Sequence, residues 1–459
     1  MRNKVLFKFL ALTIATVMLF TLFGCGKKTD NANSDSSDKS TAAVNNNETA
    51  AQTTTQDKEV KDEEVKKTKV NVTSWWDFTK TKALQELKAR FEELNPDMEL
   101  EFNQIGTGYA DKMLTIISGG GDSVPDVIML AMDKVPMFAS KGALVDLDKY
   151  ITQEYKDSLY PMVLDACTFN GKVYAVARDV TTFAMYLNKA LFEADNIPIP
   201  DDWTVDEFLD IAKKLTKYDK NGKPIQWGYY CVKYPDTMYD WILLNGGRYV
   251  TEDGTKSLVG TPETKKALQF IYDLTYKYKV SPTDIEIKQF GDNATSGIVA
   301  GKVAMQMGGL SYSTDFDTAE PKVEYAIAPI PTLDGKKVAH AFVNTWAIPK
   351  GAKNPDISWR VLEFFSGKEG QQIALDNNLG LPASKLVDTS AFIAKNSYYR
   401  HFIDSLSYAV PFEVYVYGSQ FYEQVFKPEL ELLWTDQATV DKAAAAIDEK
   451  GNKVLLGEQ

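Results

Sequence analysis

The sequence is poor in the residues that bind transition metals. Its 459 residues include three cysteines and two histidines, His340 and His401. It has neither an HExxH motif nor a paired-cysteine spacing, so ligation of a transition metal has little support. We therefore predict no metal site and no cofactor.

Basic residues are also in deficit. The chain has 51 Lys and Arg against 63 Asp and Glu, a formal net charge of −12, which argues against nucleic acid or anionic lipid as a partner. After the N-terminal region no second long apolar run occurs, so we expect no further membrane span. Forty-four per cent hydrophobic and 12 per cent aromatic residues can fill two cores. About 390 residues follow the N-terminal segments, a length that favours two domains.

The first 24 residues have the pattern of a secretion signal. Three basic residues precede a nearly unbroken apolar run over residues 9–23, and Gly24 and Cys25 follow. The alternative interpretation is a transmembrane anchor. The apolar run is short for it, because a membrane span needs roughly 20 residues. The Gly24-Cys25 junction resembles the lipobox of bacterial lipoproteins, whose cysteine is acylated. This resemblance implies cleavage after residue 24, lipidation of Cys25 and tethering on the extracytoplasmic side of the cell membrane.

Residues 25–68 have a different composition from the rest of the chain. They are rich in Ser, Thr, Asn, Gln and Ala and contain no aromatic residue. Such a segment cannot bury enough apolar surface to offset its conformational entropy. We predict a disordered, lipidated tether that lets the folded part stand off the membrane.

The folded part begins with alternating strand and helix patterns. They are expected over residues 70–76, 84–94, 98–102, 109–117 and 125–130. Strand, helix and strand in this order predict a parallel sheet with right-handed crossovers. A similar pattern resumes at residue 183, which indicates a second α/β domain.

Several short motifs occur in an order that is typical of one family. They include Asn170-Gly-Lys172, Tyr186-Leu-Asn-Lys189, Gly301-Lys-Val-Ala-Met305, Ile327-Ala-Pro-Ile-Pro and Trp346-Ala-Ile-Pro. From about residue 70 to its end, the chain resembles extracellular solute-binding protein family 1, the carbohydrate-importer family that includes maltose-binding protein. The family's usual proline after the first of these motifs is replaced by Ala177.

The resemblance implies an α/β fold of two lobes, the periplasmic-binding-protein-like fold of type II. Each lobe is expected to be a mainly parallel sheet flanked by helices. Residues 69–180 plus 334–385 would form the N-terminal lobe, and 181–333 plus 386–459 the C-terminal lobe. Cys167 and Cys231 would then lie in different lobes. We expect them to be free thiols, because a disulfide between lobes would block their closure.

The resemblance also implies a function without chemistry on the solute. A sugar or oligosaccharide would be captured between the lobes of a monomer and delivered to the permease of an ABC transporter. The alternatives are an exported glycosidase that uses paired carboxylates, a carrier of a non-sugar solute such as iron, and a structural surface protein. The tyrosine-rich C-terminal region keeps the iron alternative open.

Ligand residues are expected at strand ends and between the lobes. Aromatic rings suit the apolar C–H faces of a sugar, and polar side chains suit its hydroxyls, which cost about 1–3 kcal/mol each when they are left unpaired. The predicted ligand-binding residues are Trp76, Asp77, Asp133, Arg178, Asp179, Trp241, Gly309, Ser311, Tyr312, Asn344 and Tyr422.

Some of these candidates have a plainer interpretation. Arg178 and Asp179 could form a surface ion pair, and Trp241 could belong to the core. One of the two tryptophans that end the first strand is expected in the core as well. Asn344 stands where many relatives have glycine.

Overall fold

The computed structural model describes residues 67–458. The predicted signal peptide, Cys25 and the predicted tether up to residue 66 lie outside the described residues. Among residues 67–458, none of the helices combines the length and the apolar character that a membrane span requires.

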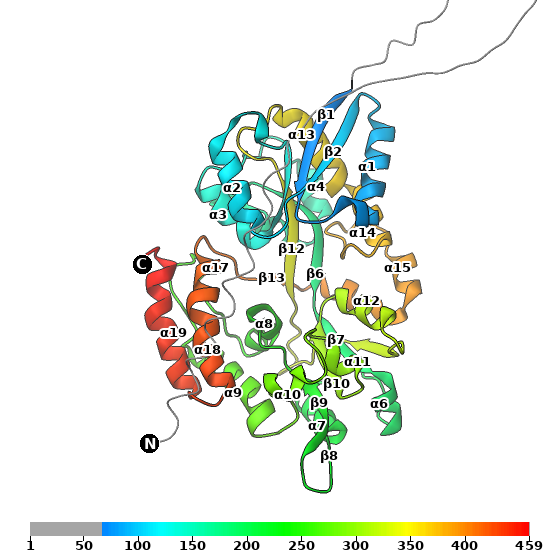
Figure 1. The fold of residues 1–459 in the computed structure, drawn as a ribbon, viewed down its shortest axis with the longest axis vertical. Coiled ribbons are helices and arrows are strands. Elements are labelled where there is room, and N and C mark those ends of the chain that lie inside the picture. Colours follow the sequence, from blue (N-terminus) through cyan, green and yellow to red (C-terminus); the bar gives the residue numbers. More distant parts are fainter. Residues whose placement is uncertain (1–66, 459) are drawn as a thin grey trace, which may run out of the picture. The chain divides into compact units, whose positions relative to one another are not determined.

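The first sheet has six strands and carries the N-terminal part of the chain (Figure 1). Its order is β13-β12-β3-β1-β2, and β6 also pairs with β12. The pairs β1–β2, β1–β3 and β12–β13 are parallel, whereas β12 runs antiparallel to both β3 and β6. The strands are β1 (Thr68–Ser74), β2 (Met98–Gln104), β3 (Val127–Ala131), β6 (Val176–Thr182), β12 (His340–Ala347) and β13 (Val410–Pro411).

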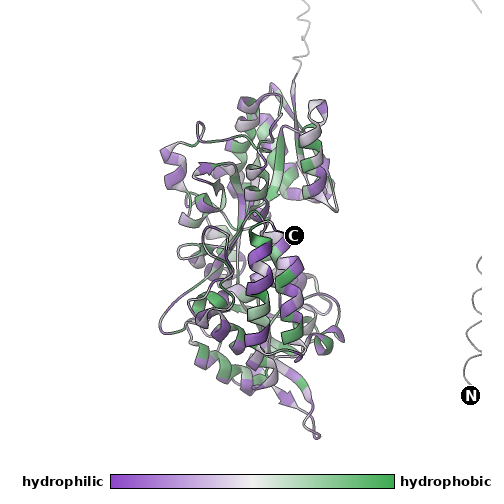
Figure 2. Ribbon diagram, turned by 90° about the vertical axis from the view of Figure 1, so that its left-hand side faces the viewer, coloured by the Kyte–Doolittle hydropathy of each residue, from purple (hydrophilic) through white to green (hydrophobic). Residues whose placement is uncertain are grey.

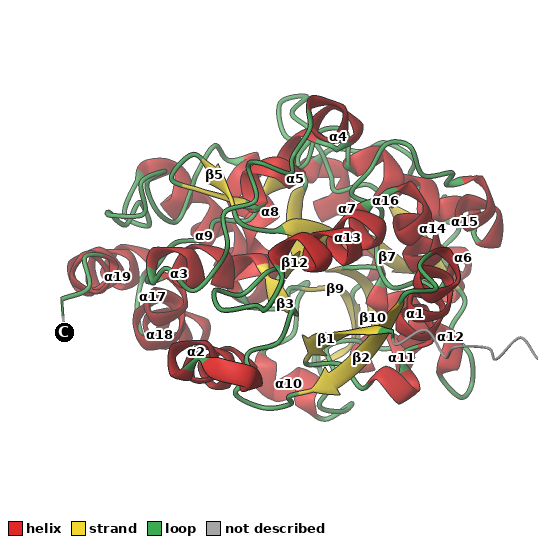
Figure 3. Cartoon of the chain, turned by 90° about the horizontal axis from the view of Figure 1, so that it is seen from above, coloured by secondary structure: helices red, strands yellow, loops and turns green. Residues whose placement is uncertain are grey.

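Helices with one apolar face cover this sheet. In α1, for example, Leu84, Leu87 and Phe91 are spaced at helical intervals and are all buried. Figure 3 shows helices around the strands of this sheet. We call the sheet and its helices the first lobe. The helices are α1 (Lys82–Leu94), α2 (Tyr109–Gly119), α3 (Val135–Ser140), α4 (Gln153–Ser158), α5 (Pro161–Ala166), α13 (Pro355–Ser366) and α14 (Lys368–Asp376), with a small hairpin of β4 (Thr168–Phe169) and β5 (Lys172–Val173).

The second sheet has five strands in the order β11-β7-β10-β9-β8. Only β9 and β10 are parallel, and the other three pairs are antiparallel. This mixed sheet corrects the expectation of a mainly parallel one, because β7 and β11 enter and leave the sheet next to each other. The strands are β7 (Ala184–Asn188), β8 (Lys217–Tyr218), β9 (Pro224–Tyr230), β10 (Val303–Gly308) and β11 (Tyr325–Ala328).

The second sheet and its helices form what we call the second lobe. Figure 2 shows hydrophobic and hydrophilic residues alternating along the helices on the surface, as amphipathic packing requires. The helices are α6 (Lys189–Ala194), α7 (Val205–Leu215), α8 (Pro235–Leu244), α9 (Pro262–Tyr276), α10 (Asp284–Lys288), α11 (Ser296–Val299), α12 (Ser311–Thr318), α15 (Ser390–Lys395), α16 (Arg400–Ser405), α17 (Gly418–Phe421), α18 (Lys427–Trp434) and α19 (Val440–Leu455).

The chain passes between the two lobes five times, between α14 and α15, between α16 and β13, and at three further places. Strand β6 continues into β7 through Phe183, β11 is followed by β12, and β13 leads into α17. We call these passages the three crossings. Residues 410–411, predicted in the C-terminal lobe, extend the six-stranded sheet instead. Cys167 and Cys231 lie in different hydrophobic cores and are free, and burial raises the pKa of each thiol to about 12.

Candidate functional site

Four of the predicted residues form one contact network at the end of the first sheet. The guanidinium carbon of Arg178 lies 4.1 Å from the centroid of the Trp76 ring. Arg178 also pairs with the Asp179 carboxylate, and the Asn344 amide donates to the other oxygen of Asp179 at 2.9 Å. The antiparallel pairing of β6 and β12 creates the last contact, because Asp179 and Asn344 are register partners.

Two members of this network, Arg178 and Asp179, are almost completely buried. The side chains of Arg178 and Asp179 are each only 2% exposed, which corrects the interpretation as a surface ion pair. Arg178 also contacts the sulfur of Met129 at 3.0 Å, and Gly380 packs against Asp179 so closely that a side chain would not fit. Arg178 and Asp179 therefore hold the Trp76 ring in place, and Trp76 and Asn344 are the two members that are partly open to solvent.

Asp77 follows Trp76 in the chain, but its carboxylate interacts only with the neighbouring residues Thr79 and Lys80. Its carboxylate accepts hydrogen bonds from the Thr79 amide at 2.9 Å and from the Thr79 hydroxyl, and it pairs with Lys80 at 3.0 Å. The Thr79 hydroxyl and Lys80 together lower its pKa. In this arrangement Asp77 begins a short 3-10 turn at residues Phe78–Lys80, and its oxygens are already used.

A cavity of about 400 Å³ lies between residues of the two lobes. We call it the cleft cavity. The first lobe contributes Asp133 and Lys134, and the start of α8 and the region of α17 contribute the opposite wall. Its lining includes the predicted residues Asp133 and Tyr422, together with Lys134, Tyr234, Pro235, Asp236, Phe342, Phe412, Glu413, Val414, Tyr415, Gly418, Ser419, Glu423 and Lys427.

Polar contacts across the cleft cavity connect the lobes. Lys134 pairs with Asp133 at 2.7 Å and donates to the hydroxyl of Ser419 at 2.6 Å. The Ser419 hydroxyl lies 3.5 Å from the Asp133 carboxylate. Tyr422 donates to the carbonyl of Glu413 at 3.4 Å, so its ring forms one side of the cavity. Asp133 and Tyr422 thus line the same cavity.

Gly309, Ser311 and Tyr312 lie where β10 of the second sheet ends. The hydroxyl of Tyr186 donates to the Gly309 carbonyl at 3.0 Å, which fixes this turn. Tyr312 packs over Gly308, where an added side chain would come within 2.2 Å of its ring. Burial and the charge of Asp236 raise the pKa of Tyr312 to about 12. Ser311 is exposed at the first turn of α12.

Trp241 is a core residue, which corrects the predicted ligand role. It is 1% exposed, and its indole nitrogen donates to the hydroxyl of Tyr229 at 3.2 Å. The rings of Phe208 and Phe270 pack against it with centroids 5.3 and 5.1 Å away. It points into the core because α8 is buried along most of its length.

Sequence reasoning missed the residues at the start of α8. Tyr234 is 55% exposed and lines the cleft cavity together with Asp236. The signal was present, because Pro235 follows a strand and proline favours the first turn of a helix. An exposed aromatic residue between a strand end and a helix start is a natural platform for a sugar face.

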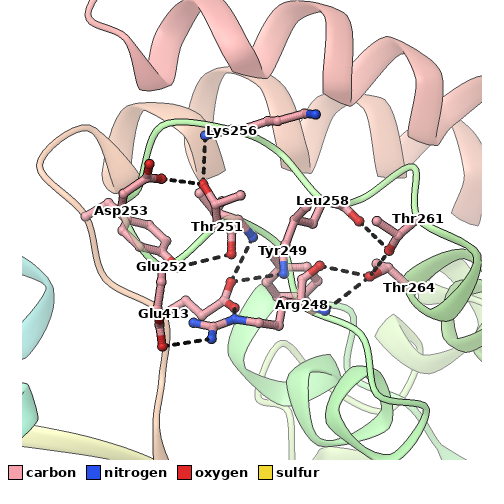
Figure 4. Close-up of polar contacts among 12 residues, drawn as sticks. Arg248, Tyr249, Thr251, Glu252, Asp253, Lys256, Leu258, Thr261, Thr264 and Glu413 are labelled. Carbon is pink, nitrogen blue, oxygen red and sulfur yellow. Dashed lines mark hydrogen bonds and ion pairs between the residues drawn. The ribbon is translucent and has the colours of Figure 1, made fainter.

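A buried carboxylate holds the crossing that separates the cleft cavity from a second cavity. Glu413 accepts from Arg248 at 2.7 Å and from the amides of Tyr249 and Val250 at 3.0 Å each (Figure 4). Burial raises the pKa of Glu413 even though Arg248 opposes this shift. The second cavity, of about 500 Å³, shares residues 412–415 with the cleft cavity as a common wall.

The described residues offer no obvious place for a metal ion. Between residues 67 and 458, His, Cys, Asp and Glu side chains do not gather in groups of three or more that could ligate one. The polar groups of the cleft cavity are instead spread over both walls. They suit hydrogen bonds to a ligand with many hydroxyls.

Known proteins of one class are similar to this chain in sequence. Residues 75–372 match the family model described as bacterial extracellular solute-binding protein. A maltotriose-binding protein of Pyrococcus abyssi is 24% identical over 302 residues, which is 64% of this chain and 61% of that protein. A maltooligosaccharide ABC transporter solute-binding lipoprotein of Streptococcus pneumoniae (strain TIGR4) is 26% identical over 267 residues, 57% of this chain and 60% of that one.

Solved structures are similar over most of the described chain. An ABC substrate-binding protein of Listeria monocytogenes in complex with cycloalternan has a TM-score of 0.72 at 25% identity, covering 86% of this chain and 100% of that one. A Rhizobium etli sugar transporter in an open conformation has a TM-score of 0.72 at 20% identity, covering 84% and 99%. The likeness confirms the predicted two-lobe α/β fold.

Proposed function

The chain belongs to the bacterial extracellular solute-binding protein family, and we propose that it captures a sugar or oligosaccharide for an ABC transporter. The solute would bind in the cleft cavity and pass to a membrane permease. Members of this family are binding proteins rather than enzymes, and capture needs no chemistry on the sugar.

The observation that carries this proposal is the lining of the cleft cavity. Partly open rings, Tyr234 and Tyr422, stand among carboxylates, a lysine and a hydroxyl that come from both lobes. Aromatic rings cover the C–H faces of a sugar, and the polar groups pair with its hydroxyls. Saccharide binding by the relatives named above supports the same class of solute.

Capture requires that the solute prefers the closed arrangement of the lobes. A solute that contacts both walls gains hydrogen bonds on closure, and this difference in free energy shifts the equilibrium. A micromolar dissociation constant corresponds to about −8 kcal/mol, which a stacked ring and several hydrogen bonds can supply. The three crossings are the segments where such a rotation would occur.

We keep the predicted lobe boundaries as part of the proposal. Residues 69–180 plus 334–385 would move as one body, and 181–333 plus 386–459 as the other. Residues 410–411 would travel with the first lobe because of their pairing with β12.

The location of the protein belongs to the proposal as well. Lipidation of Cys25 would anchor the chain on the extracytoplasmic side of the cell membrane, where its permease lies. The pneumococcal relative is named a lipoprotein, which supports this placement. A Cys25→Ala variant should appear in the culture medium or the soluble fraction, and its retention in the membrane fraction would contradict the anchor.

A thermal-shift screen against mono- and oligosaccharides tests the proposed solute class. Binding stabilises the folded state by RT ln(1 + [L]/Kd), about 2.7 kcal/mol at a hundredfold excess over Kd. At least one saccharide should raise the melting temperature and elute unchanged from the protein. Absence of a shift with every saccharide would contradict the solute class, and release of shorter sugars would indicate a glycosidase.

A further inference from the structure

The three crossings meet at one buried side chain, His340. His340 is the first residue of β12. Its ring packs edge-on against Phe183, between β6 and β7, with centroids 4.7 Å apart. The ring of Phe412, which follows β13, lies 5.9 Å away on the third crossing. A change at this histidine therefore reaches each of the three crossings.

A single carboxylate anchors His340 to the second lobe. The backbone amide of His340 donates to one oxygen of Asp240 at 2.7 Å, and ring atom Nδ1 lies 3.0 Å from the other oxygen. Both side chains are 0% exposed. Asp240 belongs to α8, whose neighbouring residues Tyr239, Trp241 and Ile242 are packed into the core of that lobe. The pair thus ties the crossings to α8.

Helix α8 also connects this anchor to the cleft cavity. Asp236 lines the cavity and stands four residues before Asp240, so the two carboxylates lie on the same face of the helix. Movement at His340 is passed through one helical turn to the wall of the cavity.

The ring of His340 is the titratable part of this junction. Burial lowers its pKa, but the charge of Asp240 and the hydrogen bond to it outweigh burial, and Asp236 adds to them, so the pKa is raised. The crossings contribute Phe183 and Phe412, and α8 also contributes the ring of Tyr239. Ring atom Nε2 has no hydrogen-bond partner.

A raised pKa fixes the sign of the pH dependence. The folded protein favours the protonated ring. The ring's contribution to the stability of the fold is therefore complete below the ordinary histidine pKa of about 6.5. This stabilising contribution is lost as the pH rises through the higher pKa that His340 has in the folded protein. Protonation adds a positive charge to the donor of a hydrogen bond whose acceptor, the Asp240 carboxylate, is already charged, so the contact becomes a stronger ion pair.

We propose that the His340–Asp240 pair is a pH-sensitive anchor for the hinge. In mild acid it fixes all three crossings to α8, and in mild base it loosens them. A loosened hinge must be ordered again on closure, so solute capture weakens as the pH rises. This last step rests on the proposed function, whereas the anchor itself does not.

The anchor can be tested without any solute. The exchange of the His340 amide, corrected for its intrinsic rate, should be at least about threefold faster at pH 8.5 than at pH 6, because the contact of the uncharged ring with Asp240 is weaker and opens more often. A His340→Gln variant keeps a hydrogen-bonding side chain but cannot be protonated, so its corrected rate should not change with pH. His401→Gln is the matched control, since His401 lies on α16 near Asp201 and should leave the wild-type pH dependence intact. Equal pH dependence in wild type and His340→Gln would overturn the anchor.

Histidine NMR of the unmodified chain tests the anchor even if the His340→Gln variant does not fold. The chain has only two histidines, and burial lowers the pKa of His401, so the two ring signals should titrate on opposite sides of the ordinary value. Titration of both rings at or below the ordinary value would overturn the anchor. With a saccharide that shifts the melting temperature, such as maltotriose, the dissociation constant should rise by up to about tenfold per pH unit across the His340 titration. A flat affinity with normal saccharide binding refutes only the link to capture, while no saccharide binding at all refutes the proposed function.

Discussion

The Trp76 ring lies over the Arg178 guanidinium at 4.1 Å, and the position of Arg178 is set by a buried carboxylate beside it. The tryptophan lies two residues after the end of β1 and the arginine lies within β6, so the contact joins two distant segments of the chain. The order of support is clear: Asn344 holds Asp179, Asp179 holds Arg178, and Arg178 holds the ring. The two ends of this series, Trp76 and Asn344, are partly exposed, and the ion pair between them is buried.

Replacement of Arg178 by methionine should be strongly destabilising. The change leaves Asp179 buried without its cation, and breaking a buried pair costs about 3–5 kcal/mol. The double variant Arg178→Met, Asp179→Asn should lose less stability than the two single losses added together. Urea unfolding of the four proteins measures this coupling. Additive losses would mean that the two side chains do not act as a pair.

Replacement of Tyr234 by alanine should weaken solute binding and leave folding almost unchanged. The ring is 55% exposed, but a bound sugar would cover it, and loss of that contact should cost about 1.5–3 kcal/mol of binding free energy. Tyr218→Ala is a matched control, because Tyr218 is 45% exposed in β8, away from the cleft cavity. Calorimetric titration should show weaker binding only for Tyr234→Ala. Equal affinities in the two variants would remove Tyr234 from the site.

Replacement of Trp241 by alanine should lower the stability of the fold rather than the affinity for the solute. Its ring is enclosed by Phe208, Phe270 and Tyr229, so alanine would leave a cavity in the core. A loss of about 3–5 kcal/mol of stability is expected, as for other large core residues. Thermal unfolding and a saccharide titration of the surviving folded protein distinguish the roles. Unchanged stability with lost affinity would restore the ligand role.

The two buried thiols should be inert in the folded protein. Their pKa values of about 12 mean that little thiolate exists at pH 8, and burial excludes the reagent. Iodoacetamide followed by peptide mapping should label Cys167 and Cys231 only after denaturation. A disulfide-linked peptide containing both residues would contradict the free state.

The sequence predicts the positions of strand ends better than the contacts between them. Trp76 and Asp133 follow recognisable strands, so their place at one sheet edge could be expected. The Asp179–Asn344 contact depends on the antiparallel register of β6 with β12, which no local pattern reveals. Trp241 was misjudged and Tyr234 was missed for a related reason: spacing does not tell which face of a short helix meets the core. In α8 the exposed ring precedes the helix, and the buried one lies inside it.

Small-angle X-ray scattering with and without a saturating saccharide tests the central claim most directly. If the two lobes close on a solute in the cleft cavity, the radius of gyration should fall when the saccharide binds, and it should fall less for Tyr234→Ala at the same concentration. Bound saccharide with identical scattering profiles would show that capture does not involve the lobes, which would contradict this account.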